Sequence, residues 1–91
     1  MVIYTNKSKL KKCNLDSKMN VVIAEEFNKE LSTTAKEIFK IIAGHCLYSG
    51  QTEIEGKKFH TLLDNKEIDF DRGVIKSIIE LKEKGYLEIS I

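Results

Sequence analysis

The chain has 91 residues, of which 42% are hydrophobic and 32% are charged, and its net charge is +1. This length fits one small domain and leaves little room for both a core and an enclosed active site, so we expect no enzyme activity and no cofactor. No apolar run reaches the roughly 18–20 residues that a membrane-spanning helix requires. The first residues place apolar side chains before charges, the reverse of a secretory signal, and this favours a cytoplasmic location.

The charges divide the chain into a basic N-terminal arm and a slightly acidic body. Residues 1–20 contain five lysines and one aspartate, whereas residues 21–91 contain ten basic and thirteen acidic side chains. A basic arm attracts phosphate groups, and an acidic body weakens non-specific affinity for nucleic acid. We therefore predict an arm over residues 1–31 and a structured unit over residues 32–91, which together form one compact domain.

Short strands are predicted within this arm. Val2–Thr5 and residues 20–24 are both apolar and β-branched. The polar, lysine-rich residues 6–18 between them indicate a loop or mobile arm, so the two strands could pair as a hairpin. Residues 21–31 fit the opening of a short helix equally well, because their last apolar side chains have helical spacing.

A helix from residue 34 to about residue 48 has the clearest pattern in the chain. Thr34 and Glu37 match a capping box, in which the threonine oxygen accepts an amide hydrogen bond and the glutamate reaches back to the cap. Gly50 is expected to end the helix. Apolar residues at spacings of three and four form its inward face: Ala35, Ile38, Phe39, Ile42 and Cys46.

Two shorter elements follow, a strand over residues 52–55 and a helix over residues 57–64, and residues 65–70 form a turn. The inward side chains of this short helix are Phe59, Leu62 and Leu63. Asp71 is a good N-cap for a last helix that runs to residue 84. Its apolar stripe comprises Val74, Ile75, Ile78, Ile79 and Leu81. Gly85 then ends the helix, and residues 86–91 alternate as a strand with Leu87, Ile89 and Ile91 on one face.

From residue 32 the order helix, strand, helix, turn, helix, strand resembles the winged-helix superfamily of DNA-binding domains. The stretch from Ile78 to Leu87 is its most specific part, since it is similar to a recognition helix that passes through a glycine into a wing strand. The resemblance implies an α+β fold, with a three-helix core, a small antiparallel sheet and a truncated wing. Residues 65–70 are longer than a usual helix-turn-helix turn. No second wing strand follows, and an N-terminal strand could take its place.

The resemblance also implies which residues contact DNA. Helical spacing from Asp71 predicts an outward face, opposite the apolar stripe, made of Arg72, Gly73, Lys76, Ser77 and Glu80. Arg72 is the only arginine in the chain, and arginine can bind a guanine edge through two hydrogen bonds. Lys57 and Lys58 begin the preceding helix, where positive charge and free amides hold phosphate. Lys11 and Lys12, with Lys7 and Lys9, are the phosphate-neutralising lysines of the arm. A solvated surface explains all these residues equally simply.

Other polar clusters do not indicate catalysis or metal binding. His45 and Cys46 are adjacent on a helix and diverge by about 100°, and neither these residues nor His60 has the spacing of a zinc site. Cys13 and Cys46 are expected to stay reduced in a cytoplasm. The carboxylates Asp64, Glu67, Asp69 and Asp71 fit turn and capping roles better than calcium or acid–base chemistry.

Two functions therefore remain in view. The first is a DNA-binding regulatory or accessory protein, acting on double-stranded DNA as a homodimer, because one short reading helix buries little surface. The alternative is a protein–protein interaction module on the same scaffold that binds a replication or transcription component. The element order and the basic arm favour the first function. The acidic body, the single arginine and the missing wing favour the second.

Overall fold

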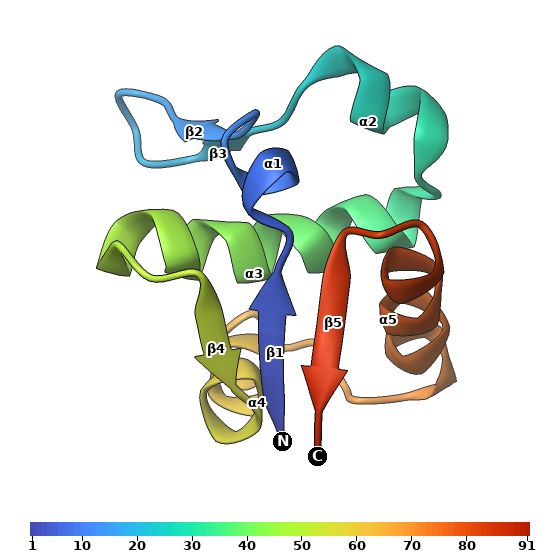
Figure 1. Cartoon of the computed structure of the whole chain (residues 1–91). Coiled ribbons are helices and arrows are strands. Elements are labelled where there is room, and N and C mark those ends of the chain that lie inside the picture. The colour runs from blue at the N-terminus through green and yellow to red at the C-terminus, as the bar shows by residue number, and fades with distance from the viewer.

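The computed structural model describes residues 1–91, and it confirms the predicted α+β architecture (Figure 1). The helices cover one face of a small sheet, and α3 crosses that face as the longest element. None of the helices is both long enough and apolar enough to span a membrane. The elements in chain order are β1 Val2–Thr5, α1 Lys7–Leu10, β2 Asn14–Leu15, β3 Val21–Val22, α2 Glu25–Glu30, α3 Thr33–Ser49, β4 Glu53–Glu55, α4 Gly56–Asn65, α5 Arg72–Glu83 and β5 Leu87–Ser90.

The N-terminal strand lies at the centre of the main sheet. The strand order is β4–β1–β5, and β1 is antiparallel to both neighbours. Ile3 pairs with Ile54 on one side and with Ile89 on the other, so three branched apolar residues form one row across the sheet. The expectation that an N-terminal strand joins the sheet is thereby confirmed, as is the C-terminal strand with its buried Leu87.

Residues 6–18 are folded, which differs from the predicted loop or arm. Asn6 caps α1, because its side-chain oxygen accepts hydrogen bonds from the amides of Ser8 and Lys9. Leu10 and Cys13 then enter the core, one helical turn apart. Two apolar residues among lysines give too short a pattern to indicate a helix from sequence, so the packing partners decide the structure here.

The second N-terminal strand pairs with β2 and not with β1 as predicted. Both sides of β1 are already occupied by β4 and β5, so no free edge remains for β3. The two alternatives for residues 21–31 each describe part of the segment, since Val21–Val22 forms a strand and Glu25–Glu30 forms a helix. The resulting β2–β3 hairpin lies against α3 (Figure 1).

An aromatic cluster joins the N-terminal segment to the rest of the fold. Phe27 of α2, Phe39 of α3 and Tyr86 pack edge to face, with ring centroids 5.0–6.1 Å apart, and all three are fully buried. The Tyr86 hydroxyl reaches the end of α2, where it donates a 2.6 Å hydrogen bond to Glu30 Oε2. Lys9 Nζ lies over the Tyr86 ring, 4.6 Å from its centroid. Alternation in residues 86–91 had assigned the inward face to Leu87, so the structure adds Tyr86 to the core.

Helix α3 begins at a different cap from the one predicted. Ser32 is the N-cap, and its hydroxyl oxygen accepts a hydrogen bond from the Ala35 amide. The carboxylate that completes the box comes from α5 and not from Glu37. Glu80 accepts 2.8 Å hydrogen bonds from both the backbone amide and the hydroxyl of Ser32. The motif at Thr34 was therefore misassigned, because the capping group lies 48 residues away in sequence.

The other predicted helix boundaries hold. Asp71 caps α5 by accepting a 3.1 Å hydrogen bond from the Val74 amide. Gly50 and Gly85 follow α3 and α5 with φ values of +73° and +80°, the left-handed conformation that glycine adopts without steric cost. Tyr86 enters the core directly after this turn. The turn at Gly85 therefore directs the Tyr86 ring into the aromatic cluster.

We predict that Tyr86→Phe lowers the free energy of unfolding by about 1–2 kcal/mol, because it removes the hydroxyl that bonds Glu30 and keeps the ring. Tyr86→Ala should cost about 3–5 kcal/mol, since it also leaves a cavity between the two phenylalanines. Urea denaturation measures both values. Tyr48→Phe is the matched control, because Tyr48 is 77% exposed, and it should leave stability unchanged. An equal loss in the two Tyr→Phe variants would contradict the role of the Glu30 hydrogen bond.

A second prediction concerns pH. Hydrogen bonds from Ser32 hold the pKa of Glu80 below its usual range, so the ionised carboxylate stabilises the fold. This contribution is complete above the ordinary glutamate pKa of about 4.3 and is lost as the pH falls through the lower folded value. Glu80→Ala should therefore cost about 1–3 kcal/mol at neutral pH, and the difference from wild type should shrink in acid.

Urea titrations between neutral and acidic pH measure this difference. Glu37→Ala is the control, because Glu37 is the capping residue suggested by sequence. It should show neither the neutral-pH loss nor the acid dependence. The reverse result, with Glu37 and not Glu80 giving the loss, would restore the capping box at Thr34.

Candidate functional site

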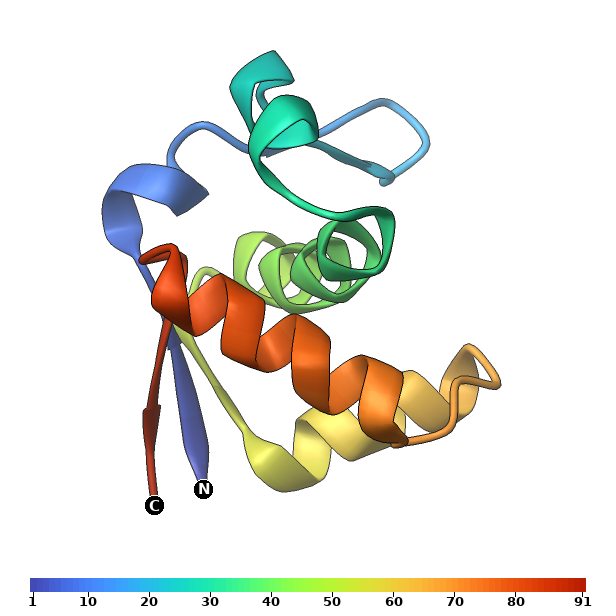
Figure 2. The ribbon, with the colours of Figure 1, turned by 90° about the vertical axis from the view of Figure 1, so that its right-hand side faces the viewer.

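The outward face of α5 is the site suggested by sequence, and it is open to solvent (Figure 2). Its inward side packs against α3, and Val74, Ile78 and Leu81 are buried there. The outward side forms a stripe of exposed residues: Arg72, Ile75, Lys76, Ile79 and Glu83. We call this set the α5 stripe. Arg72 lies in the first turn, Lys76 lies between the two isoleucines in the middle, and Glu83 is at the end.

The predicted rotation of α5 was wrong at three positions. Ser77 was placed outward, but it is only 3% exposed, and its hydroxyl donates a 2.8 Å hydrogen bond to the Gly73 carbonyl. Ile75 and Ile79 were placed inward, and they are 44% and 49% exposed. Ser77 lies three residues after Val74 and four before Leu81, which puts it on the buried face. The prediction gave residue type more weight than spacing. Ser77 can be buried because its hydroxyl bonds a carbonyl of its own helix and does not need water.

The remaining predicted residues of α5 are exposed, except for Glu80, which is half-buried. Arg72 and Lys76 point outward as expected, and Gly73 lies in the first turn. A Cβ atom at Gly73 would meet no other element, only the Asp71 carboxylate oxygen at 3.2 Å. The glycine therefore leaves this end of the helix accessible without being required by the backbone. Glu80, also predicted outward, is engaged with Ser32 and Lys84.

The predicted phosphate-binding lysines do not gather around the α5 stripe. Lys57 and Lys58 are exposed in the first turn of α4. Lys11 and Lys12 follow α1, which lies beside the far end of α5, because Asn6 bonds the Tyr86 carbonyl (Figure 2). Lys12 is also paired, with Nζ 2.6 Å from Glu26 Oε1. The cations thus occupy three separate regions, and they form no single basic face.

The loop that leads into α5 is acidic. Its exposed carboxylates are Asp64, Glu67, Asp69 and Asp71. Asp71 has the predicted capping role, and Glu67 sits in a left-handed turn with φ +57°. These carboxylates precede Arg72, so a phosphate group approaching the first turn of α5 would meet negative charge. The electrostatics of this end favour a cationic or mixed partner over a nucleic-acid backbone.

A groove beside α3 was not indicated by sequence. It lies between the β2–β3 hairpin, α3 and α4, and has a volume of about 610 Å³. Its floor is apolar, from Leu15, Val21, Ile41 and Leu62. Its cations are Lys40, Lys58 and Lys66, and its one carboxylate is Glu37. We call it the α3 groove. Three elements that are distant in sequence build it, so no local pattern could have revealed it.

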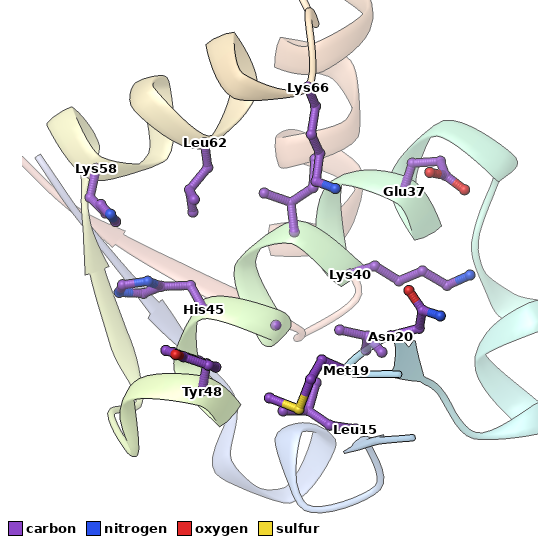
Figure 3. Close-up of a pocket in the computed structure, with 13 residues that line it drawn as sticks. Leu15, Met19, Asn20, Glu37, Lys40, His45, Tyr48, Lys58, Leu62 and Lys66 are labelled. Atoms are coloured by element: carbon purple, nitrogen blue, oxygen red, sulfur yellow. The ribbon is translucent and has the colours of Figure 1, made fainter. Parts of the chain in front are cut away.

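The side chains at the ends of the α3 groove are drawn in Figure 3. Lys58 lies beside His45 at one end, and Lys40 lies beside Asn20 at the other. Burial and the neighbouring Lys58 charge both lower the pKa of His45, so its imidazole is neutral at pH 7 and adds no charge. Tyr48 stands at the rim and is 77% exposed. The groove therefore combines a solvent-exposed tyrosine ring, cations at its two ends and an apolar floor.

Cys13 and Cys46 are both buried free thiols. Burial raises the pKa of Cys13 to about 11, and burial also raises the pKa of Cys46. No group of three or more His, Cys, Asp or Glu side chains is arranged to hold a metal ion. His60 instead packs against Phe70, with ring centroids 4.5 Å apart. Neither cysteine has the exposed, electropositive surroundings of a reactive thiol.

Comparison of the chain with protein-family models, with curated proteins and with solved structures gives no significant match. A proposed function must therefore come from the two surfaces described above, the α5 stripe and the α3 groove.

We predict that both thiols react slowly with Ellman's reagent in the folded protein at pH 8. A pKa of about 11 leaves about one Cys13 in a thousand as the reactive thiolate, and burial blocks the reagent. Both should react at once in denaturant. Rapid reaction of one thiol under native conditions would mean that its segment opens locally, and Cys13→Ser and Cys46→Ser variants would identify which.

Proposed function

We propose that this protein is a non-catalytic interaction module of the cytoplasm, built on a winged-helix-like scaffold, which self-associates through the α5 stripe. The observation that carries the proposal is the pair Ile75 and Ile79. These isoleucines lie one turn apart at the middle of the helix that resembles a recognition helix, and nearly half of each is exposed. A helix that reads bases presents polar side chains at such positions, whereas an apolar pair flanked by charges is typical of a protein interface.

The charges around the isoleucines favour a second copy of the chain as the partner. Arg72 begins the α5 stripe and Glu83 ends it, eleven residues or three helical turns later. In an antiparallel, two-fold pairing of two α5 helices, Ile75 of each copy faces Ile79 of the other. The same register brings Arg72 of each copy opposite Glu83 of the other. These isoleucine and Arg72–Glu83 pairs are self-complementary, as an isologous two-fold interface requires. The same register brings Lys76 of the two copies close together, and this repulsion opposes the dimer at low salt.

Binding to double-stranded DNA is the second candidate. Arg72, Lys76 and Lys82 are exposed cations on α5, and a helix of this kind inserts into the major groove in winged-helix proteins. The acidic loop before Arg72 and the dispersed lysines weigh against it. Both candidates use the same face of α5, so a dimer closed through the α5 stripe excludes DNA from that helix. One set of variants therefore separates them.

We predict a concentration-dependent dimer by sedimentation equilibrium, and we predict that Ile79→Glu abolishes it, because a carboxylate would be buried opposite Ile75. Arg72→Glu and Glu83→Arg should each weaken the dimer by repulsion. The double variant Arg72→Glu/Glu83→Arg should restore it, since the two charges exchange places. Ile91→Glu is the control, because Ile91 is fully exposed elsewhere on the surface.

The same variants are titrated into a labelled mixed-sequence duplex at low salt. If wild type stays monomeric at all concentrations and binds the duplex, and Arg72→Ala weakens that binding by about 1–3 kcal/mol, then α5 reads DNA and the dimer proposal is wrong. If the double charge exchange fails to restore the dimer while each single variant disrupts it, the antiparallel register is wrong.

A further inference from the structure

The α3 groove has no role in the proposed dimer, since no residue of α5 lines it. It is the largest hollow of the surface. Its volume of about 610 Å³ lies within the range of sites that enclose a ligand. Folded domains do not fit such a space, but a few side chains of one extended or helical segment do. The groove is thus suited to a short stretch of a partner chain.

The lining of the groove defines the chemistry of that stretch. Ile41 and Leu62 form an apolar floor, and apolar side chains seated there would be removed from water. Lys58 lies at one end and Lys40 at the other (Figure 3). A ligand that carries carboxylates on both sides of its apolar side chains therefore meets a cation at each end. Glu37 is the only acidic residue in the lining, so positive charge prevails.

We propose that the α3 groove binds an acidic peptide segment of a partner protein, with apolar side chains on the floor and flanking carboxylates on the lysines. Lys66, the residue that follows α4, adds a third cation to the lining (Figure 3). Tyr48 supplies an exposed ring at the rim, the kind of side chain that contributes much contact area at low entropic cost.

A peptide fits these features better than single-stranded nucleic acid. Strands of nucleic acid are held by successive aromatic side chains on which bases stack, and the groove has one tyrosine besides His45. It contains no arginine to bind phosphate through two bonds. The apolar floor has no counterpart in a sugar–phosphate chain. Nucleic-acid binding is nevertheless a measurable alternative.

The test is fluorescence anisotropy with the wild-type protein and labelled probes. The first probe is the peptide Glu-Asp-Leu-Phe-Leu-Asp-Glu. Two controls separate charge from apolar contact: Gln-Asn-Leu-Phe-Leu-Asn-Gln lacks the carboxylates, and Glu-Asp-Ser-Ser-Ser-Asp-Glu lacks the apolar centre. An oligothymidylate is the fourth probe. We expect saturable binding of the first peptide, and at least about tenfold weaker binding of both controls and of the oligonucleotide.

Protein variants localise the binding. Lys58→Glu/Lys66→Glu should weaken the first peptide at least about tenfold, and Tyr48→Ala should weaken it about threefold to tenfold. Lys11→Glu/Lys29→Glu is the matched control, because it changes net charge equally at exposed residues outside the groove, and it should change affinity less than about twofold. Circular dichroism and urea denaturation confirm that each variant is folded, and Tyr48 is exposed enough to replace without loss of stability.

Three results would overturn the proposal. One is absence of binding to the first peptide, and another is equal weakening by the groove variant and the matched control, which would show unspecific charge attraction. The third is preferential binding of the oligonucleotide with loss in Lys58→Glu/Lys66→Glu, which would make the groove a nucleic-acid site. None of these results depends on the oligomeric state, because Ile79→Glu protein can be used throughout if wild type dimerises.

Discussion

The fold depends on the ring of Tyr86, which is the point where four segments of the chain meet. It packs edge to face on Phe27 and Phe39, lies under the Lys9 ammonium, and donates its hydroxyl hydrogen to Glu30. Burial raises its pKa first, and the adjacent Glu30 raises it further, so the phenol stays protonated as a donor. Without this residue α1 and α2 would lose the side chain that they share with α3. This arrangement joins α2 and α3 to the residue that follows α5, and so holds the helix that carries the α5 stripe against the core.

Sequence patterns predicted the elements that carry local signals. Spacing located α3, and Asp71 and Gly85 bounded α5, because caps and apolar periodicity act within a few residues. Contacts between distant residues were beyond such patterns. Glu80 replaces Glu37 as the partner of the α3 cap. The α+β class and the entry of an N-terminal strand into the sheet were predicted correctly, but the central position of that strand was not. The α1 helix forms because Leu10 and Cys13 pack into the core, which a short local pattern does not indicate.

In the candidate sites, too, features with a local sequence signal were predicted and features that depend on distant contacts were not. Arg72 and Lys76 were placed outward correctly, since they belong to a helix with a strong pattern. Ser77 was predicted to point outward and Ile79 inward, and the structure shows the reverse. The prediction gave the polarity of each side chain more weight than its angular position on the helix. Lysine positions were known from the start, but their distribution over three regions follows from the tertiary fold. Lys58 and Lys40 face one hollow only because α4 and α3 meet beside the β2–β3 hairpin.

The central position of β1 has a consequence for folding. Val2 pairs with Glu55 and with Ser90, so no neighbour of this strand is closer than about half the chain. During synthesis β1 leaves the ribosome before β4 and β5, so it stays without a partner until β4 is made, and the sheet closes only with β5. Contacts of such high sequence separation slow folding. In the interval β1 exposes two unpaired edges, which can associate with other strands. Lys7 and Lys9 of α1 follow β1 directly, and their charges disfavour such association.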